Sequence, residues 1–211
     1  MCFSAEASFV AAAIVGTVGF ATVKQVTEKR QLPLALLPVL FALQQLCEGV
    51  LWVYLTNKIE PNSFLTGVYV MFAFVLWPTW FSFSALMLEQ VEWRKKVLTA
   101  SLIAGIGVSI FFVWLFSNSG AKPEIVGNSI FYGGSGHVGG FFYLSVLSLP
   151  FLFSSVPHLW AMGVAAPVSF AFTAWFYWAN FASIWCYFAA FISIYIFFVM
   201  KKLHDQKVKR S

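Results

Sequence analysis

A glutamate inside an apolar run is the first residue of this sequence that suggests chemistry. Glu48 lies within FALQQLCEGVLWVY, residues 41–54, where two glutamines and a cysteine precede it. With Gln44, Gln45 and Trp52 it recurs at spacings of three, four and seven residues, so in a helix these side chains form one stripe. Ionisable groups at membrane depth are costly and face the interior of a bundle or a wet cavity. The stripe predicts that Glu48 either lines a pocket or bonds neighbouring helices together.

Two cysteines and a histidine extend the set of candidates. Cys2 follows the initiating methionine, His137 lies in the glycine-rich GSGHVGG, and Cys186 lies in NFASIWCYFAA. A thiol next to an imidazole or a carboxyl group can act as a nucleophile with a general base, and thiols with an imidazole can bind a metal ion. All three, together with Glu48, are candidate catalytic residues, and the three alone are candidate ligands of a metal ion or haem. The candidate ligand-binding residues are Gln44, Gln45, Glu48, Trp52, Trp77, Asn180 and Trp185.

The composition predicts that these residues sit in a membrane protein. The chain has 211 residues, of which 60% are hydrophobic and 10% charged, whereas a soluble domain has about one quarter charged residues. A chain of this size cannot hide so much apolar surface in one aqueous core. The bilayer is therefore the expected partner. The net charge of +5 does not indicate a nucleic-acid partner, because the basic residues are confined to short loops and the tail.

Seven segments are long and apolar enough to be read as membrane-spanning helices, which need about 20 residues each. We therefore expect an all-α, polytopic bundle of seven transmembrane helices, with residues 1–200 as a single domain and residues 201–211 as a basic cytoplasmic tail. The predicted segments are 5–23, 34–55, 64–88, 97–116, 138–156, 159–178 and 182–200. Small residues at positions 101, 105 and 109 predict close helix packing.

The distribution of lysine and arginine predicts the orientation. Eleven of the 13 basic residues fall on one side of the predicted membrane, and only Lys58 and Lys122 fall on the other. The positive-inside rule then places the C-terminus in the cytoplasm and the N-terminus outside. The one long loop, residues 117–140, lies outside, and its glycines predict a flexible or tightly turning segment. With this orientation, Cys2, Glu48, His137 and Cys186 all lie at a similar depth, near the outer ends of their predicted helices.

Five motifs resemble those of a family of uncharacterised bacterial integral membrane proteins. The motifs are MCFSAEASF, QQLCEGVLW, VLWP, GHVGGFFY and FASIWCYFAA. The opening Met-Cys-Phe-Ser and the late Trp-Cys-aromatic-Phe-Ala-Ala motif are the most specific. The resemblance implies a seven-helix protein of the bacterial inner membrane. It implies no established activity, and the histidine that family members often carry at position 44 or 45 is glutamine here.

Two classes of function stay open. The first is a binding protein with an outward-facing polar pocket that binds, senses or passes a small molecule or a lipid. The absence of deep charges other than Glu48 favours this class over an ion-coupled pump. The second is a membrane enzyme, or a metal or haem protein, that uses the four candidate residues in acyl transfer or thiol redox chemistry. A subunit of a larger membrane complex is a further alternative, and neither the cofactor nor the oligomeric state follows from the sequence.

Overall fold

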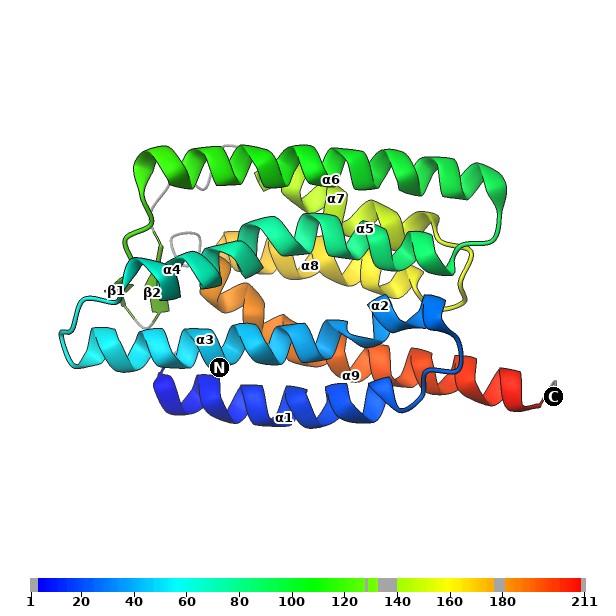
Figure 1. Cartoon of the computed structure of the whole chain (residues 1–211), viewed down its shortest axis with the longest axis horizontal. Helices are drawn as coiled ribbons and strands as arrows, with labels where there is room; N and C mark the ends of the chain where they lie inside the picture. The colour runs from blue at the N-terminus through cyan, green and yellow to red at the C-terminus, as the bar shows by residue number, and fades with distance from the viewer. Residues whose placement is uncertain (1–3, 128, 133–139, 177–180, 210–211) are drawn as a thin grey trace.

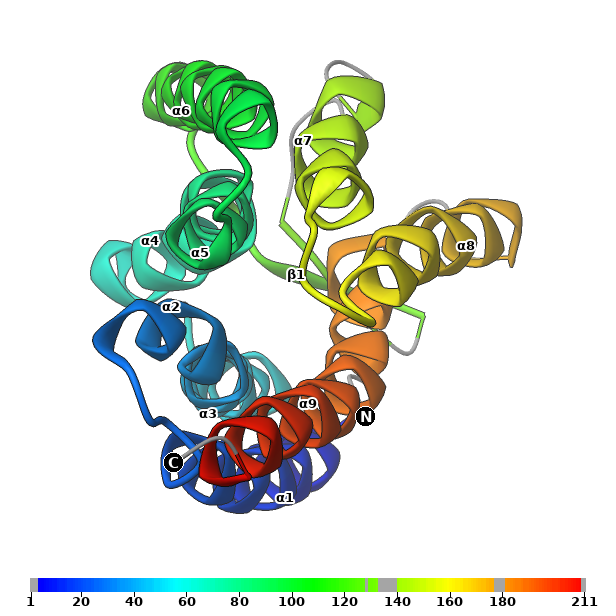
Figure 2. The same ribbon diagram turned by 90° about the vertical axis from the view of Figure 1, so that its right-hand side faces the viewer.

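The protein is an elongated bundle of helices that run along its long axis and alternate in direction (Figures 1 and 2). The computed structural model describes residues 4–127, 129–132, 140–176 and 181–209, without the side chains at 140–141, 173–174, 176, 181–187 and 189. The helices are α1 (Ala5–Val23), a 3-10 turn (Lys29–Gln31), α2 (Leu32–Ala35), α3 (Leu37–Thr56), α4 (Ser63–Val70), a π turn (Met71–Leu76), α5 (Trp77–Leu88), α6 (Glu92–Ser119), α7 (Gly140–Phe153), α8 (Trp160–Phe176) and α9 (Phe181–Val208). Strands β1 (Glu124–Val126) and β2 (Ser129–Phe131) form an antiparallel hairpin.

Four helical stretches among the described residues are long and apolar enough to cross a membrane. They are Ala5–Val23, Lys29–Thr56, Ser63–Leu88 and Glu92–Ser119, so the prediction of a helical protein with membrane-length helices is confirmed. The other three predicted segments overlap α7, α8 and α9, and α9 continues beyond its predicted segment to Val208. The number of spans and their orientation remain predictions.

Local signals in the sequence explain where several helices begin. The Ser4 side chain accepts a hydrogen bond from the Ala7 N–H at 3.2 Å and caps α1. The Asn62 side chain accepts one from the Leu65 N–H at 2.7 Å and caps α4. Such caps satisfy N–H groups that have no partner inside the helix. Pro38 lies in the first turn of α3, where its missing N–H costs nothing.

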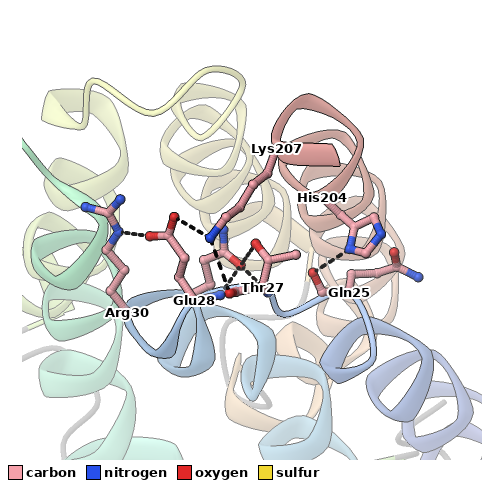
Figure 3. A network of polar contacts seen from close by, with 7 residues as sticks. Gln25, Thr27, Glu28, Arg30, His204 and Lys207 are labelled. Atoms are coloured by element: carbon pink, nitrogen blue, oxygen red, sulfur yellow. Dashed lines mark hydrogen bonds and ion pairs between the residues drawn. The ribbon is translucent and has the colours of Figure 1, made fainter. Parts of the chain in front are cut away.

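The basic loops gather at one end of the bundle, called the basic end here, and the β-hairpin lies at the other, the hairpin end (Figure 1). At the basic end, α9 is tied to the loop after α1 (Figure 3). The Lys207 ammonium donates to the Glu28 carboxylate at 3.0 Å, and Arg30 pairs with the same carboxylate. These two hydrogen bonds, that of Arg30 first, lower the pKa of Glu28. His204 and the Gln25 carbonyl add a contact at 3.3 Å.

A buried carboxylate joins two more loops at the basic end. Glu89, which is 3% exposed, accepts hydrogen bonds from the Ser155 N–H at 2.7 Å and the Ser155 hydroxyl at 2.6 Å. It also accepts from the N–H groups of Gln90 and Val91, both at 2.9 Å. Burial alone would raise the pKa of Glu89, but these hydrogen bonds outweigh burial and lower it. Glu89 therefore clamps the α5–α6 loop to the α7–α8 loop.

A π turn joins α4 to α5 at Pro78, and neighbouring helices satisfy its carbonyl groups. Proline has no N–H to give to the turn before it. The Tyr143 hydroxyl on α7 donates to the Ala73 carbonyl, and the Ser109 hydroxyl on α6 donates to the Val75 carbonyl at 2.7 Å. The irregular turn is thus bonded to the helices on either side of it.

Helix α6 approaches α5 closely because Gly105 has no side chain. A Cβ atom at position 105 would lie 2.2 Å from the Pro78 carbonyl oxygen, whereas one at Gly107 would meet nothing within 4 Å. Ser101 and Ser82 share a hydrogen bond at 3.0 Å along the same contact. The small residues predicted to mediate packing on this helix therefore do so.

Replacing Gly105 with alanine should destabilise the bundle. The added methyl group would overlap the Pro78 carbonyl, and overpacking of this kind costs about 1–3 kcal/mol. Thermal unfolding in detergent micelles measures the effect, with Gly107→Ala as the matched control. Equal melting temperatures for the two variants would show that α6 does not approach the Pro78 carbonyl closely at Gly105.

Replacing Glu89 with glutamine should destabilise the protein at neutral pH by about 1–3 kcal/mol, because an amide NH₂ would face N–H donors. The pKa of Glu89 is below its ordinary value of 4.5 in the folded protein. Its stabilisation is therefore present above about pH 4.5 and is lost as the pH falls through the folded pKa.

Melting curves of wild type and Glu89→Gln between pH 7 and pH 3 test this, and the difference should shrink below pH 4.5. Glu92→Gln is the control, since Glu92 is exposed and its ion pair with Lys95 at 2.7 Å lies on the surface. A constant difference across the pH range would contradict the clamp.

Candidate functional site

The polar stripe of α3 faces the interior, as its spacing predicted. Glu48 is 0% exposed, and Gln44, Gln45 and Trp52 are all buried. The exposed positions of α3, such as Leu46, lie on the opposite side. Helix α3 packs against α1, α4 and α9, which enclose the stripe. The stripe faces inward because exposing a carboxyl group to lipid has a high free-energy cost, which contacts with other helices avoid.

Two hydrogen bonds join the stripe to α4 and α5. The Trp77 indole N–H donates to the Gln44 amide oxygen at 2.7 Å, and the Tyr69 hydroxyl donates to Glu48 Oε1 at 3.4 Å. The Trp77 ring also stacks on Phe41, with 4.1 Å between ring centroids. Trp77, a predicted ligand-binding residue, therefore uses its only polar atom to hold α5 against α3.

The β-hairpin folds back over this region and contributes a tyrosine that the sequence did not single out. Tyr132, just after β2, is 3% exposed and stacks on Tyr69, with 4.1 Å between centroids and 12° between planes. Ile130 is buried in the same cluster. The loop prediction missed this structure, although the run Ser129–Tyr132 holds residues that favour strands. The β-hairpin therefore covers the side of the Glu48 region that faces the hairpin end of the bundle.

Two buried polar atoms on the stripe have no hydrogen-bond partner within the described part of the chain. They are Gln45 Oε1 and Trp52 Nε1, on side chains that are 3% and 5% exposed. Seven residues separate them, and Glu48 lies between. Nearly all buried polar atoms in proteins have a partner. An acceptor and a donor left open on one helix face are therefore complementary to a small molecule that carries both groups.

The thiol of Cys47 belongs to the packing of this region. It lies 3.6 Å from the Leu65 carbonyl oxygen, to which it can donate, and it is 8% exposed. It links α3 to α4 beside the Glu48–Tyr69 bond. Cys47 is the cysteine whose side chain the structure describes.

The other candidates fall outside the described residues. Cys2, His137 and Asn180 do so entirely, and Trp185 and Cys186 lie in α9 at positions where only the backbone is described. The catalytic and metal-binding sets that include them stay predictions. Among the described residues, no group of three or more histidine, cysteine, aspartate or glutamate side chains could hold a metal ion.

Comparison with known proteins places the chain in one family. Neither the curated proteins nor the solved structures include a match to it. A family model matches residues 1–211, which is the whole chain. The protein therefore belongs to the family of unknown function DUF6629.

Proposed function

We propose that this protein spans a bacterial inner membrane with seven helices and binds a small polar molecule beside Glu48. The observation that carries the binding proposal is a pair of buried atoms on one face of α3, Gln45 Oε1 and Trp52 Nε1, that have no hydrogen-bond partner among the described residues. Glu48, held by Tyr69, lies between them. The four membrane-length helices support the location.

The site specifies the chemistry of its ligand. The Gln45 oxygen needs a hydrogen-bond donor, and the Trp52 N–H needs an acceptor. Seven residues of helix rise about 10 Å at about 1.5 Å per residue, so the ligand must carry a donor and an acceptor separated by about that length. A buried site that pairs every polar group discriminates against analogues that lack one of them. With the basic end in the cytoplasm, the hairpin end faces outward, so Tyr132 stands on the side from which a ligand enters.

The orientation is tested by labelling cysteines in whole cells. We expect a membrane-impermeant maleimide to modify Lys122→Cys in intact cells and Lys209→Cys only after permeabilisation, in a background where the native cysteines are serine. Both positions are exposed. The reverse pattern would place the Glu48 site on the cytoplasmic side.

The ligand is tested with the double variant Gln45→Leu, Trp52→Phe, which removes both open polar atoms. Gln45→Leu nearly keeps the side-chain volume, and Trp52→Phe removes part of the buried indole. Wild type incubated with a protein-free small-molecule extract of bacterial cells should carry a bound mass in a native mass spectrum. The double variant should lose this mass and still unfold cooperatively without extract. Gln45→Leu alone should melt at the wild-type temperature or above, because removing an unpaired buried polar group at nearly constant volume is neutral or stabilising.

Leu46→Met is the control, since Leu46 is exposed on the opposite face of α3. It should keep the bound mass. An extract that leaves no mass on wild type, or the same mass on wild type and the double variant, would contradict the site.

A further inference from the structure

An apolar groove between α6 and α7 lies apart from the Glu48 site. Its volume is about 700 Å³, which is within the range of about 300–1,000 Å³ for small-molecule sites. It is lined by Val97, Leu98, Ala100, Ser101, Ala104, Gly107, Val108, Phe111 and Phe112 of α6 and by Phe142, Ser145, Val146, Leu149 and Phe153 of α7. Helix α6 stands at the periphery of the bundle, so the groove opens sideways (Figure 2).

The dimensions of the groove fit one lipid tail. From Val97 to Phe112 the helix rises about 22 Å at about 1.5 Å per residue. Half of a hydrocarbon core is about 15 Å thick, so a chain that enters at one end of the groove stays within it across its own leaflet. Ser101 is the polar residue on the α6 wall nearest the basic end. Its hydroxyl already shares a hydrogen bond with Ser82, so an acyl chain beside it leaves no hydroxyl unsatisfied.

The basic end of the groove carries positive charge on the same helix face. Arg94 precedes Val97 by three residues and Leu98 by four, so it continues the stripe that lines the groove. Its guanidinium lies 5.1 Å from the centroid of the exposed Trp93 ring, and it forms no ion pair within the described residues. Lys96 is exposed beside it. Tryptophan and arginine together are typical of the headgroup level of a membrane.

We propose that the α6–α7 groove binds an anionic phospholipid, with one acyl chain in the groove and the phosphate at Arg94. The apolar lining takes the chain, and a guanidinium can bind a phosphate through two parallel hydrogen bonds. The site rests on the membrane location and is independent of the ligand beside Glu48.

Charge decides between a lipid and a second copy of the chain. Two copies in one membrane have the same orientation, so facing grooves would bring two sets of Arg94, Lys95 and Lys96 together at one end. In each copy Glu92 pairs with Lys95, and the described ion pairs leave Arg94 and Lys96 without an acidic partner. Like charges at an interface are unfavourable, whereas an anionic headgroup neutralises them.

The test titrates detergent-purified protein with dioleoyl phosphatidylglycerol or dioleoyl phosphatidylcholine, which share their acyl chains, and counts bound lipid by native mass spectrometry. Wild type should prefer the anionic lipid. Arg94→Gln should weaken its binding roughly fivefold, because a basic residue near an anionic headgroup contributes about that factor. Lys122→Gln, which removes a cation from the hairpin end, should change nothing.

Ala104→Phe, which fills the exposed floor of the groove, should abolish binding of both lipids, and Ile103→Phe on the neighbouring exposed position should not. Gly107→Leu is a second filling variant, because a Cβ there meets nothing within 4 Å. Equal binding of the two lipids by wild type, or full binding by both filling variants, would overturn the proposal. A dimer that the filling variants dissociate would assign the groove to a second copy instead.

Discussion

Polar groups inside an apolar bundle must be satisfied by one another, and this constraint organises the centre of the protein. The π turn at Pro78 leaves carbonyl groups that Tyr143 and Ser109 satisfy from two different helices. A hydrogen bond that has no water to compete with it holds its partners in one geometry, because breaking it leaves a buried polar atom exposed to hydrocarbon. The irregular turn between α4 and α5 is therefore fixed to both α6 and α7.

The two ends of the bundle are held by different means. At the basic end, Glu28 ties a loop to α9 through ion pairs, and Glu89 joins two loops through a buried carboxylate. At the hairpin end, aromatic stacking of Tyr132 on Tyr69 replaces charge. A charged clamp fixes loops rigidly, whereas a stacked ring can separate without leaving a charge unpaired. This difference is compatible with the proposed entry of a ligand at the hairpin end.

The proposed ligand site and the proposed lipid site use the bundle in opposite ways. Beside Glu48, helices close around polar atoms, and Gln45 Oε1 and Trp52 Nε1 have no partner among the residues that the structure describes. Along α6, one face is fixed to α5 through Gly105 and to the π turn through Ser109, another packs against α7, and the outer face is apolar and exposed. The same helix can be both a wall of the fold and an open apolar surface because Ser101, Gly105 and Ser109 lie on its packed side.

The sequence by itself determined the helical class, the membrane-length helices and the inward face of α3. These features depend on side-chain hydrophobicity and on helical periodicity, which are local properties. Only the tertiary structure decided the partners: Tyr69 for Glu48, Trp77 for Gln44, and Ser155 for Glu89, which are separated by 21, 33 and 66 residues. It also extended α6 back to Glu92, because a charged stretch can remain helical beyond the apolar core. A pattern shows which way a side chain points, but the group it meets depends on how the helices are placed in space.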